Sequence, residues 1–418
     1  MIRRMVLYLS NSHYDICIIG AGPAGLAAAI ESSRRGLSCL LLDRNKKPGK
    51  KLYATGNGRC NLCNEHYDRD CYYGSDFAAE IIYKRNLRDF VTEYMDGLGI
   101  KTVSKNGYYY PMSMQASAVV WALRDAAVMN GVEIISNSEV SAVEDKGDKY
   151  IISYSGGKTA EAESVILATG SPSAPELGAA SYETLYSLFE SLKLEYEPFS
   201  PCLGPVAVKE DMNPVAGVRC DAVISFHIAE QRERGELQLT ADGISGIVVF
   251  NMNEYMKEQA HNGHNTIHIN LLPDISHDEF ISRFNTFRKT SPNRKVLGFL
   301  NGFLNDKLAL YHLNRLKEDG SVKDDVNVSE SEAGLIYRAL TDWKLSIGGF
   351  NDENRSQASA GGIATSQIDP KDMHIIDRRE LYAVGETTDV LGKCGGYNIS
   401  YALYTGFLAG RACLGGNL

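Results

Sequence analysis

Short apolar runs separated by glycine-rich turns characterise the first part of the chain. Residues 16–19, ICII, form an uninterrupted apolar run of buried-strand length, and residues 38–43, SCLLLD, form a second run that ends in an acid. An alanine-rich stretch that favours a helix lies between them. Apolar runs without polar alternation are typical of strands that are buried on both faces, as in a parallel sheet covered by helices. This pattern predicts an α/β fold.

The pattern changes further along the chain. Residues 81–101 and 115–131 are predicted as helices, and residues 131–170 as strands linked by glycine and aspartate turns. Alternating apolar and polar positions between about 201 and 275 predict an antiparallel sheet, in the segments GPVAVKE, AVISFHIAE, GELQLT and NTIHINLL.

A helical region is predicted over residues 276–340. After Pro292, apolar residues recur at helical spacing, namely Val296, Leu297, Leu300, Phe303, Leu304 and Leu308. A stripe of this kind usually packs into a core. A lid over an active site is the alternative that the pattern leaves open.

Length and composition limit the class of protein. A chain of 418 residues is long for a single core, so two or three domains are expected. Hydrophobic residues make up 44% and charged residues 23% of the chain, as in soluble globular proteins. The formal net charge of -9 argues against a nucleic-acid partner, whose binding needs a basic surface. No long apolar run occurs and the N-terminal stretch lacks a signal-peptide core, so no membrane span is expected.

The cysteines indicate the compartment. Nine of them are scattered from Cys17 to Cys413. An odd and dispersed set fits a reducing compartment better than a disulfide framework, so we expect a cytoplasmic protein. The oligomeric state stays open.

The first apolar run is followed by GAGPAG, a G-x-G-x-x-G motif. Alone this motif is weak evidence, but here it lies between a predicted strand and a predicted helix, with Asp43 at the end of the next strand. In such a context Gly20 permits a tight turn, Gly22 lets the backbone approach a pyrophosphate, and Gly25 allows close helix packing. Asp43 is then placed to bind the ribose of an adenosine. A turn without a ligand is the alternative. The candidate cofactor contacts are Gly20, Gly22, Pro23, Ala24, Gly25, Asp43 and Arg44.

Two later segments extend this interpretation. ESVILATGS is a short strand ending in Ala168, Thr169 and Gly170, and RELYAVGETTDV is another ending in Gly385 and Glu386. The three markers, in this order, resemble the FAD domain of the two-dinucleotide-binding flavoproteins.

This resemblance implies roles for particular residues. The last strand would bring an acid to the ribityl chain of the flavin, at a position where aspartate is usual, so Glu386 or the nearby Asp389 is expected there. The backbone of Val140 would meet the adenine.

A glycine turn and a helix follow in GKCGGYNISYALYTGFLAGRACLG. A helix that begins at about Asn398 would direct its partial positive charge at the pyrimidine edge of a flavin, where the reduced ring carries negative charge. A helix that only closes the domain is the alternative. Cys394 is expected to be a packing residue, with a reactive thiol at the ring as the alternative. The candidate contacts in this turn are Gly395, Gly396, Tyr397 and Asn398.

Residues 49–64, GKKLYATGNGRCNLCN, contain little that could fill a core. The Cys60-x-x-Cys63 pair could be a redox dithiol or half of a zinc site. A zinc site needs a second pair at short spacing, which His66 and Cys71 do not convincingly form, so no metal is expected. We predict instead that this loop lies along the flavin and its phosphates, with a surface loop and a solvated Arg59 as the alternative. The candidates are Lys51, Gly58, Arg59, Cys60 and Asn61.

Together with this loop, four further segments resemble the BaiN-like family of FAD-dependent oxidoreductases, which includes proteins called aminoacetone oxidases. The matching segments are residues 49–61, 107–123, 235–250, 358–370 and 381–398. The sequence departs from the family at Asn57, where glycine is common. It also departs after VILATG, where part of a glycine-rich turn with an acid is missing.

The resemblance implies an α/β fold in which a Rossmann-like domain with a parallel sheet binds FAD non-covalently and is interrupted by an inserted region. The FAD-binding domain would comprise residues 13–200 and 354–418. The insertion would contain a β-rich, barrel-like subdomain at 201–275 and 341–353 and a helical subdomain at 276–340.

The sequence therefore predicts an FAD-dependent oxidoreductase that moves a hydride between the flavin and a small substrate or NADH or NADPH. No second G-x-G-x-x-G motif opens a strand–helix unit, so a nicotinamide donor would bind in the substrate cleft. An amine oxidase that uses oxygen, a flavin-dependent tRNA-modifying enzyme and a flavin-binding sensor remain alternatives. No acid or base is identified, although Tyr108, Tyr109 and Tyr110 could face the cleft.

Overall fold

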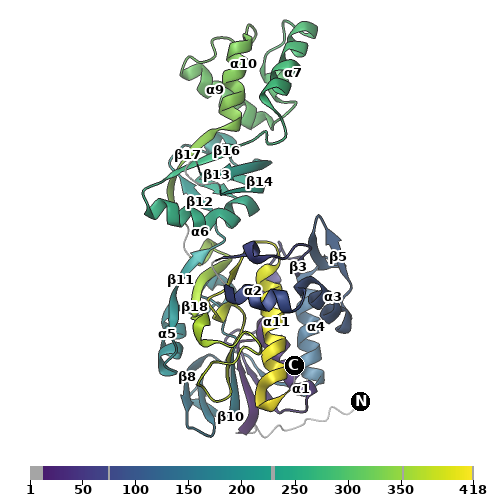
Figure 1. Ribbon diagram of the computed structural model, residues 1–418, viewed down its shortest axis with the longest axis vertical. Coiled ribbons are helices and arrows are strands. Elements are labelled where there is room, and N and C mark those ends of the chain that lie inside the picture. The colour runs from purple at the N-terminus through teal and green to yellow at the C-terminus, as the bar shows by residue number, and fades with distance from the viewer. Residues whose placement is uncertain (1–12, 74–75, 227–230, 351–352, 417–418) are drawn as a thin grey trace. The chain divides into compact units, whose positions relative to one another are not determined.

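The computed structural model describes residues 13–73, 76–226, 231–350 and 353–416. The chain forms two compact units, one built from Met1–Pro201 and Gln357–Leu418 and the other from Cys202–Ser356. In Figure 1 the purple first strand and the yellow last helix, from opposite ends of the chain, belong to the same unit. Among the described residues, no helix has the length and apolar character that crossing a bilayer requires.

The first unit is built on a sheet of seven strands in the order β7-β2-β1-β10-β9-β8, with β19 also paired to β10. Strands β2, β10 and β19 run parallel to their neighbours around β1, whereas β8, β9 and β10 form an antiparallel meander. All four residues of β2 are buried, as its apolar run predicts for a central strand. The strands are β1 (His13–Ile19), β2 (Cys39–Leu42), β7 (Glu133–Ile135), β8 (Val140–Asp145), β9 (Tyr150–Tyr154), β10 (Lys158–Leu167) and β19 (Leu381–Ala383).

The helices of the unit are α1 (Pro23–Arg34), α2 (Asp76–Lys84), α3 (Leu87–Gly97), α4 (Ala116–Met129), α5 (Tyr182–Ser191) and α11 (Tyr397–Ala412). Helices α1 and α11 touch at their backbones: a Cβ atom on Gly406 would lie 2.1 Å from the carbonyl oxygen of Ala24. Only glycine fits there, so the close packing of two helices from distant parts of the chain depends on this residue.

The predicted helix over 81–101 is wrong in its extent, because the structure has two helices there. Helix α2 ends at Lys84, and the side chain of Asn86 accepts hydrogen bonds from the backbone amides of Arg88 and Asp89 at the start of α3. Asparagine is a favoured N-cap residue, so Asn86 starts a second helix and the first one does not continue. The prediction over 115–131 is confirmed by α4.

Three small sheets complete the unit. Strand β6 (Tyr108–Pro111) lies between β3 (Cys63–Asn64) and β5 (Thr102–Lys105). Strand β4 (Tyr72–Tyr73) pairs with β20 (Leu391–Gly392), and β11 (Tyr196–Cys202) with β18 (Ala358–Ile363). The pair β4–β20 ties the segment after β2 to the C-terminal segment.

The second unit contains a closed barrel with the strand order β12-β15-β14-β13-β16-β17. The barrel strands are β12 (Val206–Val208), β13 (Arg219–Ser225), β14 (Arg232–Thr240), β15 (Gly243–Ser245), β16 (Thr266–Asn270) and β17 (Trp343–Phe350). The predicted antiparallel, barrel-like sheet is therefore confirmed, although the end of its predicted strand AVISFHIAE, at 227–230, lies outside the described residues. Helix α6 (Ile247–His261) packs on β14.

A helical part follows β16. It contains α7 (His277–Thr290), α8 (Leu297–Leu300), α9 (Asp306–Glu318) and α10 (Glu330–Thr341). The apolar stripe after Pro292 belongs to the core of this unit, as the sequence predicts, with Val296, Leu300 and Leu308 fully buried. It is not one helix, however, since Asn305 caps a new helix, α9. A lid over an active site stays an open alternative.

Candidate functional site

The turn between β1 and α1 has the geometry of a phosphate-binding site. A Cβ atom on Gly25 would lie 1.9 Å from the carbonyl oxygen of Gly20, so close packing requires this glycine. On Gly22, by contrast, a Cβ atom would meet nothing within 4 Å, and no side chain caps the first turn of α1. The space beside Gly22 is therefore free at the positive end of a helix that Pro23 opens. This arrangement fits the pyrophosphate of FAD; the contact itself stays a prediction.

Asp43 follows β2 and is held by two backbone amides. Its Oδ2 accepts a hydrogen bond from the Ala21 amide at 2.7 Å and its Oδ1 one from the Asn45 amide at 2.7 Å. Burial raises the pKa of the carboxyl group, whereas these two hydrogen bonds act against that shift. The carboxylate thus fixes the turn between β1 and α1, and its contact with a ribose stays a prediction.

The residues expected around the adenosine lie beside this carboxylate. The carbonyl oxygen of Asp43 accepts a hydrogen bond from the Ser138 amide at 2.8 Å. Arg44 lies 3.5 Å from Glu139, the residue before Val140, and its guanidinium also donates to the carbonyl oxygen of Ala179. Val140 is buried at the start of β8. The structure therefore brings Asp43, Arg44 and Val140 to one edge of the sheet.

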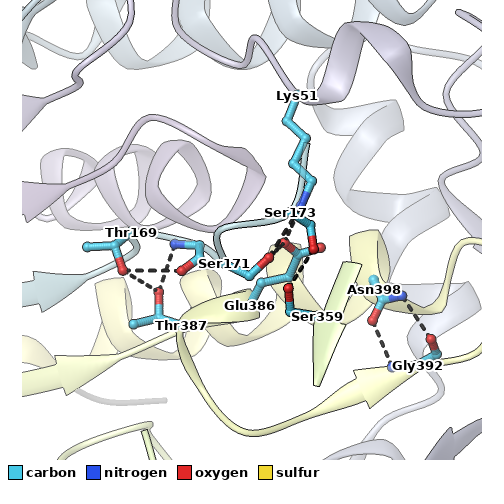
Figure 2. Close-up of polar contacts among 10 residues, drawn as sticks. Lys51, Thr169, Ser171, Ser173, Ser359, Glu386, Thr387, Gly392 and Asn398 are labelled. Carbon is cyan, nitrogen blue, oxygen red and sulfur yellow. Dashed lines mark hydrogen bonds and ion pairs between the residues drawn. The ribbon is translucent and has the colours of Figure 1, made fainter. Parts of the chain in front are cut away.

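Lys51 and Glu386 form the charged centre of the candidate site. The Lys51 ammonium lies 2.6 Å from Glu386 Oε2, which also accepts a hydrogen bond from the Ser171 hydroxyl at 3.1 Å. Figure 2 shows Lys51 extending towards the carboxylate from a different segment of the chain. Both side chains are partly exposed, 30% for Lys51 and 21% for Glu386, so the pair remains accessible to a ligand.

Thr387 joins the other two predicted markers. Its buried hydroxyl accepts a hydrogen bond from the Gly170 amide at 3.0 Å and lies 3.3 Å from the Thr169 hydroxyl (Figure 2). The amide of Ala168 in turn donates to the carbonyl oxygen of Ile19 at 2.9 Å. The carboxyl ends of β1, β10 and β19 therefore meet at one edge of the sheet, where ligands of such folds bind.

Gly385 is packed into the same edge. Its amide donates to the Thr405 hydroxyl of α11 at 3.1 Å, and a Cβ atom on it would lie 3.0 Å from the Ala24 side chain at the start of α1. Glu386 is therefore held close to the helix start that would bind phosphate.

The structure separates the two acids between which the sequence left a choice. Asp389 Oδ1 accepts a hydrogen bond from the Gly361 amide at 3.0 Å, and its own amide donates to Ile363, so this residue holds β18. Burial raises the pKa of Asp389. Glu386 points to Lys51 instead, which makes it the better candidate for the ribityl contact.

The glycine turn before α11 has the form that the sequence predicts. Gly395 and Gly396 both have positive φ angles, and the helix begins at Tyr397, one residue before the expected position. The Asn398 side chain accepts from the Gly392 amide at 2.7 Å and donates to the Gly392 carbonyl at 2.9 Å (Figure 2). Asn398 therefore holds the turn together through its side chain.

The loop at 49–64 is anchored to α4, since the Ala116 amide donates to the carbonyl oxygen of Gly58 at 2.8 Å. Asn57 has a φ of 56°, a left-handed conformation that asparagine adopts more readily than most residues, which explains how it replaces a family glycine. Arg59 is exposed, with its guanidinium 5.8 Å from the Tyr110 ring centre. The side-chain amide nitrogen of Asn61, when it faces Tyr109, donates a hydrogen bond to the carbonyl oxygen of that residue. Contact of this loop with flavin stays a prediction.

The thiols of this region are poorly suited to redox chemistry. Cys60 and Cys63 are fully buried, and burial raises the pKa of each to about 12. Burial also raises the pKa of Cys394 to about 11. Thiols with such pKa values are protonated near neutral pH and are weak nucleophiles. This argues against the redox dithiol that the Cys60-x-x-Cys63 spacing left open.

Several polar residues of this edge were missed from the sequence. Ser171 and Thr387 directly follow the ATG and GE markers, so their positions could have indicated them. The Ser173 and Ser359 hydroxyls, 2.5 Å apart in the same region (Figure 2), come from distant segments and carry no local signal. His66 and Cys71, which the sequence analysis considered as partners of Cys60 and Cys63 in a zinc site, come together with Asp68 in a group that contains neither of those cysteines.

Comparisons with known proteins agree with this geometry. A family model described as HI0933-like protein Rossmann domain matches residues 14–412. The 3-dehydro-bile acid delta(4,6)-reductase of Clostridium scindens is 33% identical over 409 residues, which cover 95% of this chain and 98% of that protein. The ribosomal RNA dihydrouridine synthase of Escherichia coli is 28% identical over 401 residues, or 93% of this chain and 95% of that protein.

A solved structure shares the fold over nearly the whole chain. The 3-ketosteroid delta1-dehydrogenase of Sterolibacterium denitrificans aligns with a TM-score of 0.52 at 11% identity, and covers 96% of this chain and 99% of its own. At this identity the likeness concerns the fold alone. The family match and the full-length relatives confirm the resemblance found in the motifs. The chain therefore belongs to the HI0933-like Rossmann family, the group of BaiN-like flavin-dependent oxidoreductases.

Proposed function

We propose that this protein is an FAD-dependent reductase that takes a hydride from NADH or NADPH and saturates a carbon–carbon double bond conjugated to a carbonyl group. The observation that carries the cofactor assignment is the convergence of the open helix start at Gly22 with the Lys51–Glu386 pair. The family of flavin-dependent oxidoreductases supports the reaction class.

The substrate class rests on the chemistry that the names of two relatives share. One name describes reduction of delta(4,6) double bonds in a 3-dehydro bile acid, and the other describes formation of dihydrouridine. In both cases the double bond is conjugated to a carbonyl group. Hydride addition to such a bond is favoured because the negative charge that develops can move to the carbonyl oxygen. A conjugated carbonyl compound is therefore the substrate class that we assign.

The residues of this chain would bind and orient the cofactor. Bound FAD would supply the two-electron carrier between donor and substrate. The helix start at Gly22 would hold the pyrophosphate, and Glu386 the ribityl hydroxyls. The turn at Gly395 and Gly396 would place the positive end of α11 at the pyrimidine edge, where negative charge collects on reduction.

A proton must also reach the substrate, and Tyr108 is the donor that we propose. A Cβ atom on Gly395 would lie 3.4 Å from the Tyr108 ring, so this ring is next to the turn that would hold the flavin. A phenol is a suitable general acid for an enolate.

Anaerobic stopped-flow absorbance tests the proposal. The purified protein is mixed with NADH or NADPH, then with a small enone, and finally with air. We expect rapid loss of the visible band of oxidised flavin with one nucleotide, and recovery of the band on addition of the enone. Recovery with air alone, after reduction by an amine, would support the amine oxidase instead. A protein that binds no flavin would overturn the proposal.

A second candidate, modification of RNA, is favoured by one observation. The segment 44–59 contains six cationic and no acidic residues, in a chain with a net charge of -9. Lys46 and Lys47 in this segment are exposed and form no ion pair among the described residues. Net charge alone therefore understates how strongly this surface could attract phosphate groups. Incubation of the reduced protein with unmodified ribosomal RNA, followed by nucleoside mass spectrometry, separates the candidates.

A further inference from the structure

Three side chains with different donor atoms meet on the segment between β3 and β4. His66 Nε2 contacts Asp68 Oδ2, and Asp68 Oδ1 lies 3.5 Å from Cys71 Sγ. One potential ligand atom from each residue lies within 4.8 Å of the others. In the described part of the chain, no other group of three such residues comes together in this way. We propose that His66, Asp68 and Cys71 form a binding site for one divalent ion of the zinc class.

The donor set fits zinc. Zinc takes imidazole nitrogen, carboxylate oxygen and thiolate sulfur at bond lengths of about 2.0–2.3 Å in a tetrahedron. Ligand atoms of such a tetrahedron lie roughly 3.3–3.8 Å from one another by the same bond lengths. Small rotations of the His66 and Cys71 side chains would reach these separations. The fourth position would be taken by water, because His66 is 71% exposed on the open side of the cluster.

The backbone already has the conformation that such a site needs. The amide of Asp70 donates to Asp68 Oδ1 at 2.8 Å, and the Lys393 amide donates to the carbonyl oxygen of Cys71 at 2.8 Å. The Tyr67 hydroxyl donates to Ser400 of α11 at 2.7 Å. Cys71 is buried and His66 is open to solvent, so an ion could enter from outside and bind the thiolate beneath. Binding would therefore require little rearrangement of the chain.

The same contacts also serve local structure, and the experiment has to separate the two roles. Asp68 and Cys71 form a reciprocal capping box around the short helix η2 (Arg69–Cys71), and His66 with Asp68 is an ordinary imidazole–carboxylate pair. A purely structural cluster would bind no zinc with a defined stoichiometry. A metal site would do so and would depend on all three side chains.

Calorimetric titration of zinc into chelator-treated full-length protein, with metal content measured by mass spectrometry, is the test. We expect one zinc per chain, and at least tenfold weaker binding in Cys71→Ser and in His66→Gln. The matched controls are Cys220→Ser, another thiol, and His268→Gln, which removes an imidazole 2.5 Å from Asp342. Both controls should bind zinc as the unchanged protein does.

Two outcomes would overturn the site: no stoichiometric zinc in the unchanged protein, or unchanged affinity in both Cys71→Ser and His66→Gln. Because Cys71 is buried, thermal melting must show that Cys71→Ser folds; His66→Gln, at an exposed position, provides the test if it does not. Cobalt substitution gives a second readout, since sulfur-to-cobalt charge-transfer absorption should be present only when Cys71 is. The titration is made with and without FAD, so its result does not depend on the proposed reductase activity.

Discussion

The ammonium group of Lys51 lies 2.6 Å from the carboxylate of Glu386, although the two residues are 335 positions apart in the chain. The pair links the loop after β2 to the end of β19, the two segments that would enclose the centre of a bound dinucleotide. Ser171, from the end of β10, donates to the same carboxylate oxygen. One ion pair thus holds three segments in the arrangement that the cofactor would need.

Replacing Lys51 with methionine should weaken FAD binding. The substitution keeps the length of the side chain but removes the cation that orients Glu386 and that would face the phosphates. We expect the dissociation constant of FAD to rise about tenfold, which corresponds to about 1.4 kcal/mol. Titration of the apoprotein with FAD, followed by quenching of flavin fluorescence, measures this change.

Lys50 provides the matched control for that titration. Its ammonium donates to the backbone carbonyl of Glu176 at 3.1 Å and forms no ion pair in the described structure. Lys50→Met should therefore bind FAD nearly as the unchanged protein does. Equal losses in the two variants would show that general positive charge, and not the pair with Glu386, matters for the cofactor.

Two glycines of the first turn should respond in opposite ways to alanine. A Cβ atom on Gly25 would clash with the Gly20 carbonyl at 1.9 Å, so Gly25→Ala should lower the free energy of unfolding by at least about 2 kcal/mol. Gly22→Ala has free space and an ordinary φ of -77°, so it should melt normally yet lose flavin. Melting temperature and flavin content of the purified variants distinguish the effects. A Gly22→Ala protein with full flavin content would place the phosphates elsewhere.

Much of this fold could be predicted from local patterns. Buried apolar runs identify β1 and β2, and alternating segments identify the barrel, because burial on one or both faces of a strand determines these patterns. The helix breaks were also visible in principle, as Asn86 and Asn305 are residues that favour caps. In both places the apolar spacing continues across the cap, so spacing alone does not show where one helix ends and the next begins.

The pairing of side chains from distant segments could not be predicted in the same way. Nothing near Glu386 in the sequence indicates Lys51, and both Glu386 and Asp389 follow the last strand. Only the tertiary structure assigns one acid to Lys51 and the other to the Gly361 amide. Similarly, the spacing of His66, Asp68 and Cys71 becomes informative only after the turn that brings them together is known.

The buried thiols should make the protein less stable at alkaline pH. Burial raises the pKa of Cys60 and of Cys63 from 9.0 to about 12. A thiol whose pKa is higher in the folded state stays protonated up to a higher pH there than in the unfolded state. Its contribution to the free energy of unfolding is therefore fully present below pH 9 and is lost as the pH rises towards 12. Thermal melting at pH 8 and pH 10 should therefore show a decrease, and the decrease should be smaller in Cys63→Ala. A decrease of the same size in that variant would assign the effect to other groups.

Replacing Tyr108 with phenylalanine should separate the two halves of the proposed reaction. The phenol lies beside the Gly395 turn and would protonate the substrate, whereas reduction of the flavin by the nicotinamide needs no such proton. Loss of a general acid usually costs about 100-fold or more in rate. We therefore expect substrate reduction to slow by at least about 100-fold while flavin reduction changes by less than about twofold. Tyr109→Phe is the control, since neighbouring residues of β6 point to opposite faces of the strand. If both half-reactions slow together in Tyr108→Phe, the tyrosine positions the flavin and another group supplies the proton.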